Sequence, residues 1–498
     1  MSLSIHPWIS ASVPVHRFAC LRHTLLVLLG ALLTLQACAP ATNRYALVEQ
    51  RLRSGDYIGA DQVIEQAEGE YGSKSRVLYD MDRGMTLHLA GKYQVSNARL
   101  EEAEHNVEEL YTRRIRTETQ AFLTNDATLP YEGEPFEQVL LNVIKALNYA
   151  IMGQGDEALV EARRVDQRLN LLADRVEDEA EYRDDPFARY VSGILYEVTG
   201  DLNNAFIAYR NAYRGYQSTT SWSPTGPPPI LRGDLLRMSD ALGFRQQHET
   251  YRQEFSEVAW QTSVELKDLA QVIVISYNGL APRKEDLFVD LPVSAEALNL
   301  VLLTKAATRS ANSREKRATE SLLYALNGRV VRVAVPRLVE SKTRVAYSRI
   351  ALSGTAGPTE ATTELVHDIG ATAEKALDER LPAIATKAVA RAATKFALAE
   401  GAKYGAGKAA GEDAGPVIGT LVGILAKWIA VASEEADKRS WRTLPDEIQL
   451  ARLWVPPGEY ELHVQAVNRR GNHIGTASSR SLTLQQGEAR FIVERVLQ

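Results

Sequence analysis

The chain has 498 residues, of which 45% are hydrophobic and 24% are charged, so its composition is that of a globular protein with room for two or three domains. The formal net charge is −6, and no long run of lysine or arginine occurs. A surface that binds phosphates needs clustered basic residues, so composition and charge argue against a nucleic-acid partner.

The first forty residues have the pattern of an export signal. Basic residues precede an unbroken apolar stretch over 24–35, which ends in Leu35-Gln36-Ala37-Cys38. This ending resembles a lipobox, the site at which a bacterial lipoprotein is cut before a cysteine that becomes lipidated. We expect residues 1–37 to be the signal peptide and Cys38 to carry the lipid. The alternative is an ordinary secretory signal followed by a chance cysteine.

Cysteine usage agrees with this interpretation. The other cysteine, Cys20, would leave with the signal, so the mature chain cannot form an internal disulfide. The second mature position is Ala39 and not aspartate, which, by resemblance to enterobacterial sorting rules, favours the outer membrane. We therefore expect a chain that is lipid-anchored in the outer membrane and faces the periplasm.

Residues 38–260 are expected to form a solenoid of paired helices. Four windows share one spacing, in which a glycine is followed five residues later by alanine or serine. The glycine would end the first helix of a hairpin, and small residues let two helix axes approach closely. The glycines are Gly55, Gly91, Gly153 and Gly200, and the small residues are Ala60, Ser96, Ala158 and Ala205. Seven residues before the last three glycines lie Gly84, Ala146 and Gly193.

This spacing resembles the tetratricopeptide repeat (TPR), with generic helical hairpins as the alternative. Segments 107–134 and 166–184 interrupt the spacing, and helices over 230–242 and 244–260 would cap the array. The resemblance implies a curved array whose first helices line a concave face. Polar and aromatic side chains on those helices are candidates for binding a protein partner; they are Asn142, Lys145, Tyr149, Arg189, Ser192 and Tyr196.

The pattern then changes to that of strands, which predicts a β-rich domain formed by 261–360 and 440–498. Apolar or alternating runs predict strands over 272–275, 330–335, 345–352, 448–455, 460–467, 479–484 and 489–496. The Pro456-Pro457-Gly458 turn before Tyr460 resembles small periplasmic β-sandwich modules. The expected fold class is α+β multidomain, an N-terminal all-α TPR-like solenoid followed by a sandwich-like β domain.

An Ala/Gly-rich helical insertion is expected over 361–439. Thr362 and Thr363 are the expected caps of its first helix, and Pro382 suits the first turn of a second one. Within the insertion, 414–432 is almost wholly apolar and long enough to cross a bilayer. Two interpretations remain open for this segment, a buried helical hairpin and a membrane-inserting element.

No pattern of catalytic, metal-binding or cofactor-binding residues is present. The Gly-Lys pair within 401–409 lacks the first glycine and the Ser or Thr of a phosphate-binding loop. The histidines are scattered, and the acidic residues lack the alternation of a calcium loop. We therefore expect no catalytic residue, no metal, no cofactor and no small-molecule substrate.

The whole sequence resembles bacterial outer-membrane lipoproteins with TPR repeats, a family of largely unassigned role. The function expected from this resemblance is a non-enzymatic scaffold for protein–protein interaction in cell-envelope or secretion-system assembly. Its partners would be other envelope proteins or peptides, and the membrane through the lipid on Cys38. The alternative is a pore-forming or membrane-remodelling component that uses 414–432, with a hydrolase as a distant third.

Overall fold

The computed structural model describes residues 41–121, 126–175, 185–218, 223–292, 330–354, 357–385, 387–388 and 435–497. The chain divides into two compact units, one ending at Leu47 and the other running from Val48 to Gln498. The first unit is described only from Ala41 onward, and the paired helices and the sheets belong to the second.

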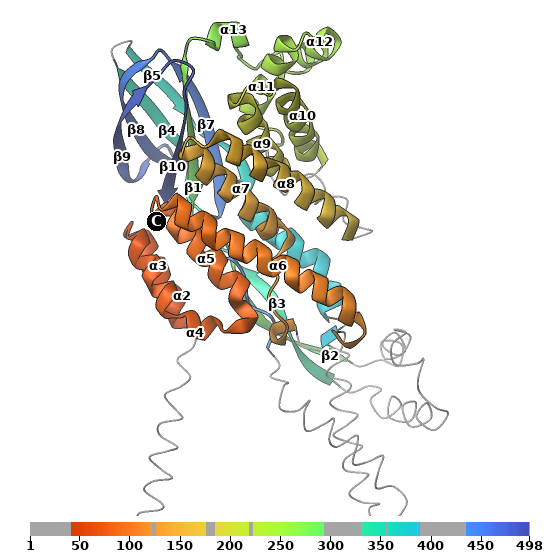
Figure 1. Cartoon of the computed structure of the whole chain (residues 1–498). Helices are drawn as coiled ribbons and strands as arrows, with labels where there is room; N and C mark the ends of the chain where they lie inside the picture. Colours follow the sequence, from red (N-terminus) through yellow and green to blue (C-terminus); the bar gives the residue numbers. More distant parts are fainter. Residues whose placement is uncertain are drawn as a thin grey trace, which may run out of the picture. The chain divides into compact units, whose positions relative to one another are not determined.

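The described N-terminal half consists of helices that follow one another as antiparallel hairpins (Figure 1). The four glycines expected to end a first helix all have positive φ angles, which confirms that part of the repeat pattern. Gly243, with a φ of 67°, ends a further first helix outside the four predicted windows. The helices are α2 Ala41–Arg53, α3 Tyr57–Gln66, α4 Glu68–Tyr71, α5 Arg76–Leu89, α6 Tyr93–Ala121, α7 Pro135–Ile151, α8 Gly155–Arg175, α9 Pro186–Val198, α10 Leu202–Ser218, α11 Pro229–Ala241, α12 Arg245–Glu254 and α13 Ser263–Leu266, with short 3₁₀ turns η1 Ser73–Ser75 and η2 Asp126–Thr128.

The small residues of the repeat pattern lie where two helices of a hairpin cross. A Cβ atom on Gly84 of α5 would lie 2.3 Å from Leu100 of α6, and one on Gly193 of α9 would lie 2.4 Å from Tyr209 of α10. Ser96 on α6 also donates a 2.7 Å hydrogen bond to the carbonyl oxygen of Gly84. The glycines thus make room for large side chains of the second helix, as the spacing predicts.

The C-terminal half contains two four-stranded sheets, with strand orders β10-β1-β7-β6 and β5-β4-β8-β9, and a separate β2-β3 pair. Strand β10 pairs with β1 in parallel, and the other neighbours are antiparallel. The strands are β1 Ala270–Asn278, β2 Arg283–Pro292, β3 Val330–Val339, β4 Val345–Gly354, β5 Gly357–Thr362, β6 Glu364–Asp368, β7 Glu447–Val455, β8 Gly458–Asn468, β9 His473–Leu484 and β10 Ala489–Val496. All seven predicted strands are present, and the chain is an α+β fold.

Strand β1 is buried along its whole length because each of its faces packs against a different core. Val272 and Val274 belong to the core between the two four-stranded sheets. Ile273 and Ile275 alternate with them and belong to the core that the sheet shares with the helices. One sheet therefore lies between the helical array and the second sheet.

The start of the predicted helical insertion is wrong in detail. Residues 357–362 and 364–368 are the strands β5 and β6, so Thr362 and Thr363 do not cap a helix. Instead, the Thr363 hydroxyl accepts from the Ser348 amide and donates to Gln449, which joins neighbouring strands. The helix covers 369–385, its N-terminal amide at Ala371 is capped by Asp368, and Pro382 lies within it.

Candidate functional site

The helices and the sheet β10-β1-β7-β6 share one buried apolar core. On the strand side this core contains Ile275 and Tyr277, and on the helix side it contains Leu147 of α7 and Phe187 of α9. We call the side of the helical array that packs against this sheet the inner face. Because the sheet covers the inner face, a partner cannot occupy that face while this packing persists.

A buried network of charges joins strand β7 to helices α9 and α11. Arg452 of β7 has a fully buried side chain and donates to Glu197 at 2.9 Å and to Asp234 at 2.6 Å. Arg237 of α11 donates to the same two carboxylates. The network contains two carboxylates and two guanidinium groups, so its charges cancel.

Aromatic and amide groups complete this network. Tyr190 donates to Asp234 and Tyr209 donates to Glu197. Both guanidinium groups lie 5.0 Å from the ring centre of Trp454. When the Gln271 side-chain amide is oriented so that both its oxygen and its nitrogen are satisfied, its oxygen accepts two further hydrogen bonds from Arg452. Burial alone would raise the pKa of Glu197, but Arg237 and Arg452 hold it well below its usual value. Glu197 is therefore ionised at neutral pH.

An irregular segment over 435–446, which precedes β7, also packs against the helices. The Arg439 guanidinium donates to the carbonyl oxygens of Lys74 and Leu129. The Trp441 amide donates to Glu137 at 2.7 Å, and the Trp441 ring is buried. The chain thus supplies an irregular segment of its own that packs against the helical array.

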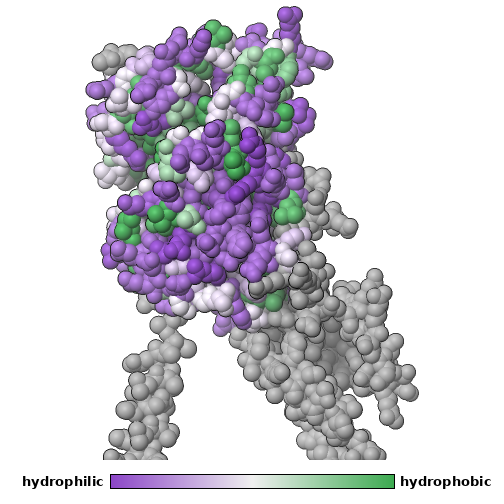
Figure 2. All heavy atoms as spheres, in the orientation of Figure 1, coloured by the Kyte–Doolittle hydropathy of each residue, from purple (hydrophilic) through white to green (hydrophobic). Residues whose placement is uncertain are grey.

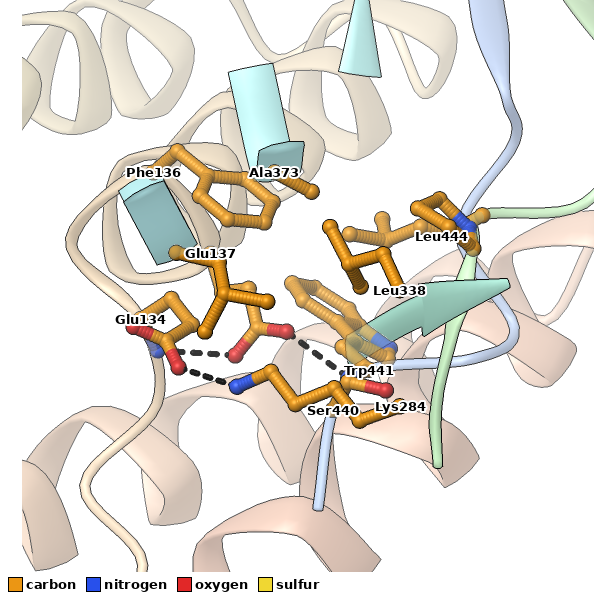
Figure 3. Close-up of a pocket in the computed structure, with 12 residues that line it drawn as sticks. Glu134, Phe136, Glu137, Lys284, Leu338, Ala373, Ser440, Trp441 and Leu444 are labelled. Atoms are coloured by element: carbon orange, nitrogen blue, oxygen red, sulfur yellow. Dashed lines mark hydrogen bonds and ion pairs between the residues drawn. The ribbon is translucent and has the colours of Figure 1, made fainter. Parts of the chain in front are cut away.

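A small cavity lies where this segment meets α7 and the β2-β3 pair. Figure 3 shows Glu134, Glu137 and Lys284 on one side of it and apolar side chains on the other. Its volume is about 20 Å³, which is room for a single water at most. The apolar lining residues include Phe136, Leu338, Ala373, Trp441 and Leu444. A cavity of this size cannot hold an organic substrate.

The two glutamates beside the cavity have opposite pKa shifts. Burial, together with the negative charge of Glu134, raises the pKa of Glu137 to about 7. Burial acts in the same direction on Glu134, but the charges of Lys284 and Arg380 outweigh it and lower its pKa to about 2. Glu134 and Glu137 also form the capping box at the start of α7. The pair therefore has a structural role. Near neutral pH, Glu134 is fully ionised and Glu137 is only partly ionised.

A larger groove of about 360 Å³ lies between the second helices of two hairpins, α6 and α8. We call it the outer groove. Its lining from α6 is Glu101, Glu104, His105 and Glu108, and its lining from α8 is Arg164, Gln167, Arg168 and Leu171. Behind it lies Lys145 of α7, whose ammonium contacts Glu101, Glu104 at 2.8 Å and Glu161 at 3.2 Å. Burial alone would lower the pKa of Lys145, but Glu104 and Glu161 raise it, so the ammonium stays charged.

The six residues predicted to bind a partner lie mostly inside the fold. Asn142, Lys145, Ser192 and Tyr196 are buried, and Tyr149 and Arg189 are partly exposed. Asn142 donates to Glu104 and Glu161, Arg189 pairs with Asp166, and Ser192 donates to the Ala188 carbonyl. The premise that these side chains line an open concave face does not hold for Asn142, Lys145, Ser192 and Tyr196, because they are buried within the helical array. Binding of a partner by these residues is a prediction that no contact tests.

The remaining predicted features fall outside the described residues. Cys38 and the apolar segment 414–432 are both in parts of the chain that the structure does not describe. Within the described ranges, no helix is long and apolar enough to cross a membrane. The same ranges contain no group of three or more His, Cys, Asp or Glu side chains placed to hold a metal ion.

The sequence interpretation missed the residues that join the sheet to the array. One signal was available, because Arg452 interrupts the apolar run over 448–455 of a strand expected to be buried. A charged residue in such a run requires a buried partner of opposite charge. No sequence signal identifies Glu197 and Asp234 as those partners, since they lie 255 and 218 residues away.

No protein-family model and no curated protein matches the sequence. A solved structure of MamA from residue 41 to its end, from Desulfovibrio magneticus RS-1, is similar at 15% identity over 44% of this chain and 92% of that one, with a TM-score of 0.27. A putative kinesin light chain from Podosopora anserina, with nearly identical TPR-like repeats, is similar at 15% identity over 44% of this chain and 93% of that one, with a TM-score of 0.29. Neither similarity indicates what this chain binds.

Proposed function

We propose that this protein is a lipid-anchored lipoprotein of the bacterial outer membrane that acts as a scaffold for other cell-envelope proteins. The observation that carries the scaffold is the array of helical hairpins, with glycines of positive φ at the expected turns. Arrays of this kind present extended surfaces to other proteins. The apolar stretch that ends in Leu35-Gln36-Ala37-Cys38 supports the lipid anchor.

Because the inner face is buried, it is not available for binding a protein partner. The sheet, the segment over 435–446 and the Arg452 network already use that face. Partners would therefore contact the outer surfaces of the helices or the β strands. The cavity beside Glu137 is too small for an organic substrate.

The scaffold is tested by capture from cross-linked envelopes. The full chain with a C-terminal tag is expressed in a Gram-negative host, cross-linked in living cells, and recovered from detergent extracts. We expect a small, reproducible set of envelope proteins that is absent from recovery of an unrelated lipoprotein with the same tag. Recovery of the same proteins by the control lipoprotein would contradict the proposed scaffold function.

The anchor is tested separately with Cys38→Ser. Without the thiol no thioether-linked lipid can form, so we expect the variant to remain unprocessed or to leave the membrane fraction, and to take up no palmitate analogue. Cys20→Ser is the matched control, since that residue lies within the expected signal. Failure of the wild-type chain to take up the analogue would contradict lipidation at Cys38.

A further inference from the structure

The outer groove combines a hollow with polar groups that the fold leaves incompletely partnered. It measures about 360 Å³ and opens between α6 and α8. Arg168 lines it with only 5% of the residue exposed, and the Nη1 atom of Arg168 has no hydrogen-bond partner among the described residues. A buried guanidinium nitrogen without an acceptor is costly, so a ligand whose acceptor meets this nitrogen when the Arg168 side chain turns toward the groove would be favoured.

The other Arg168 contacts leave room for such an acceptor. Its Nη2 atom donates to Glu104 at 3.3 Å and to Glu108 at 3.4 Å, both long for hydrogen bonds to a charged group. Asn142 does not line the groove, but it lies behind it, donates to Glu104 and has an Oδ1 atom without a partner among the described residues. The groove is therefore a built site with incomplete hydrogen bonding, whereas the Arg452 network is complete.

The charges around the groove select the kind of ligand. Its lining contains three glutamates and two arginines, and the pair behind it, Glu161 and Lys145, adds one charge of each sign. The excess is negative, and the most exposed side chains are acidic: those of Glu101 and Glu108 are 54% and 62% exposed, whereas that of Arg164, which pairs with Glu101, is 37% exposed. Figure 2 shows that the surface over α6 is predominantly hydrophilic. A free anion would be repelled, while a group that combines a neutral acceptor with nearby positive charge would be attracted.

We propose that the outer groove binds an extended basic segment of a protein partner. A backbone carbonyl oxygen of that segment accepts from Arg168 Nη1, and its lysine or arginine side chains pair with Glu101 and Glu108 at the rim. The exposed Leu171 gives the stem of a basic side chain an apolar surface. The proposal rests on the scaffold function and states the chemistry of one partner and its place.

The test uses the full chain in a non-ionic detergent and a fluorescent peptide of alternating lysine and glycine, with a glutamate–glycine peptide of equal length as the probe for nonspecific binding. Fluorescence anisotropy gives the affinity at several salt concentrations. We expect binding of the basic peptide only. Glu101→Gln with Glu108→Gln should weaken it about fivefold and reduce its salt dependence, as expected for the loss of two partly exposed ion pairs.

The chain provides a matched control on the same helix. Glu102 and Glu109 are exposed residues of α6 that do not line the groove, so Glu102→Gln with Glu109→Gln changes the same charge at a different place. We expect this pair to change the affinity less than twofold. If both double substitutions weaken peptide binding equally, the peptide is attracted to the whole helix, and the groove is not its binding site.

A second variant tests the contact with Arg168. Arg168→Lys keeps the positive charge but cannot place a donor where Nη1 lies, so we expect weaker binding with an unchanged salt dependence. Circular dichroism and thermal melting establish that each variant folds. An affinity equal to that of the wild type in folded Arg168→Lys, or no binding of the basic peptide at all, overturns the proposal. Capture of envelope proteins by a variant with a disabled groove would leave the scaffold intact, so the two failures are distinguishable.

Discussion

Two charged clusters of this molecule use the same residue types for different purposes. The inner cluster, around Arg452, is buried between strand β7 and helices α9 and α11, and its two carboxylates and two guanidinium groups are all hydrogen-bonded. The outer cluster, around Lys145 and Arg168, has a similar mixture of charges, but it borders a groove and contains polar atoms without a partner among the described residues.

The difference between the clusters shows how to separate a structural role from a binding role. A buried network whose charges cancel and whose hydrogen bonds are complete has no unpaired donor or acceptor for a ligand. Its role is therefore to join the sheet to the array. A network that is incomplete and reaches the surface can gain free energy from a ligand. Residue type alone would have assigned both clusters the same role.

The largest expected difference in stability comes from removing one arginine from each cluster. Arg452→Ala leaves Glu197 and Asp234 buried with one cation fewer, and we expect it to lower the free energy of unfolding by about 3–5 kcal/mol. Arg164→Ala removes a partly exposed arginine that contacts the glutamates of the groove, and we expect a loss of about 1 kcal/mol or less. Chemical denaturation of the two variants measures both values. Similar losses would show that the two clusters are equally structural.

A smaller effect is expected from adding a single methyl group beside the inner cluster. Gly193→Ala places a Cβ atom 2.4 Å from the Tyr209 ring, whose hydroxyl donates to Glu197. Overpacking of this kind costs about 1–3 kcal/mol. The matched control is Gly69→Ala, because Gly69 is helical and exposed and has nothing within 4 Å of its Cβ position. Thermal melting should show a loss for the first variant only, and equal behaviour would place Gly193 away from a helix crossing.

The smallest effect is a change in pH dependence at the junction beside α7. Because the pKa of Glu137 is raised from 4.5 to about 7, the folded chain binds its proton more tightly than the unfolded chain. This group therefore makes stability fall as pH rises from about 4.5 to about 7. Glu134, with a pKa lowered to about 2, contributes in the opposite direction, and only below 4.5.

Glu137→Gln should accordingly flatten the curve of melting temperature against pH between pH 5 and 8. Burial and neighbouring charges raise the pKa of Glu447 to about 7 as well, so part of the slope should remain. Glu249→Gln, at an exposed position of α12, is the control and should leave the slope as it is. If Glu137→Gln has the wild-type slope, the Glu137 carboxyl does not titrate in this range.

Much of the architecture is local and could be predicted from the sequence. Gly91 and Gly200 end helices because a positive φ is needed there, and the alternation Leu462, Val464 and Ala466 marks one buried face of β8. Patterns of this kind depend only on residues that are close in the chain. The strands β2, β5 and β6 were not predicted, and β5 is an example of the reason, because Gly357–Thr362 is short and polar and carries no apolar alternation.

The packing of the sheet on the array could not be predicted, and the candidate site depends on it. Asn142 and Lys145 were expected to face a partner because they are polar residues on a first helix. In the structure they face Glu104 of α6, in the preceding hairpin, and Glu161 of α8, in the same hairpin. A polar residue on a helix has the same sequence signature whether its partner is internal or external, and only the fold distinguishes the two cases.

Hydrogen exchange of the backbone amides tests most directly the claim that the inner face is closed and the outer groove is available. The full chain is measured alone and with the lysine–glycine peptide. We predict slow exchange in β7 and α9 in both samples, and added protection with the peptide only in the parts of α6 and α8 that line the groove. Fast exchange of β7 in the chain alone, or peptide-induced protection centred on β7 and α9, would contradict the account.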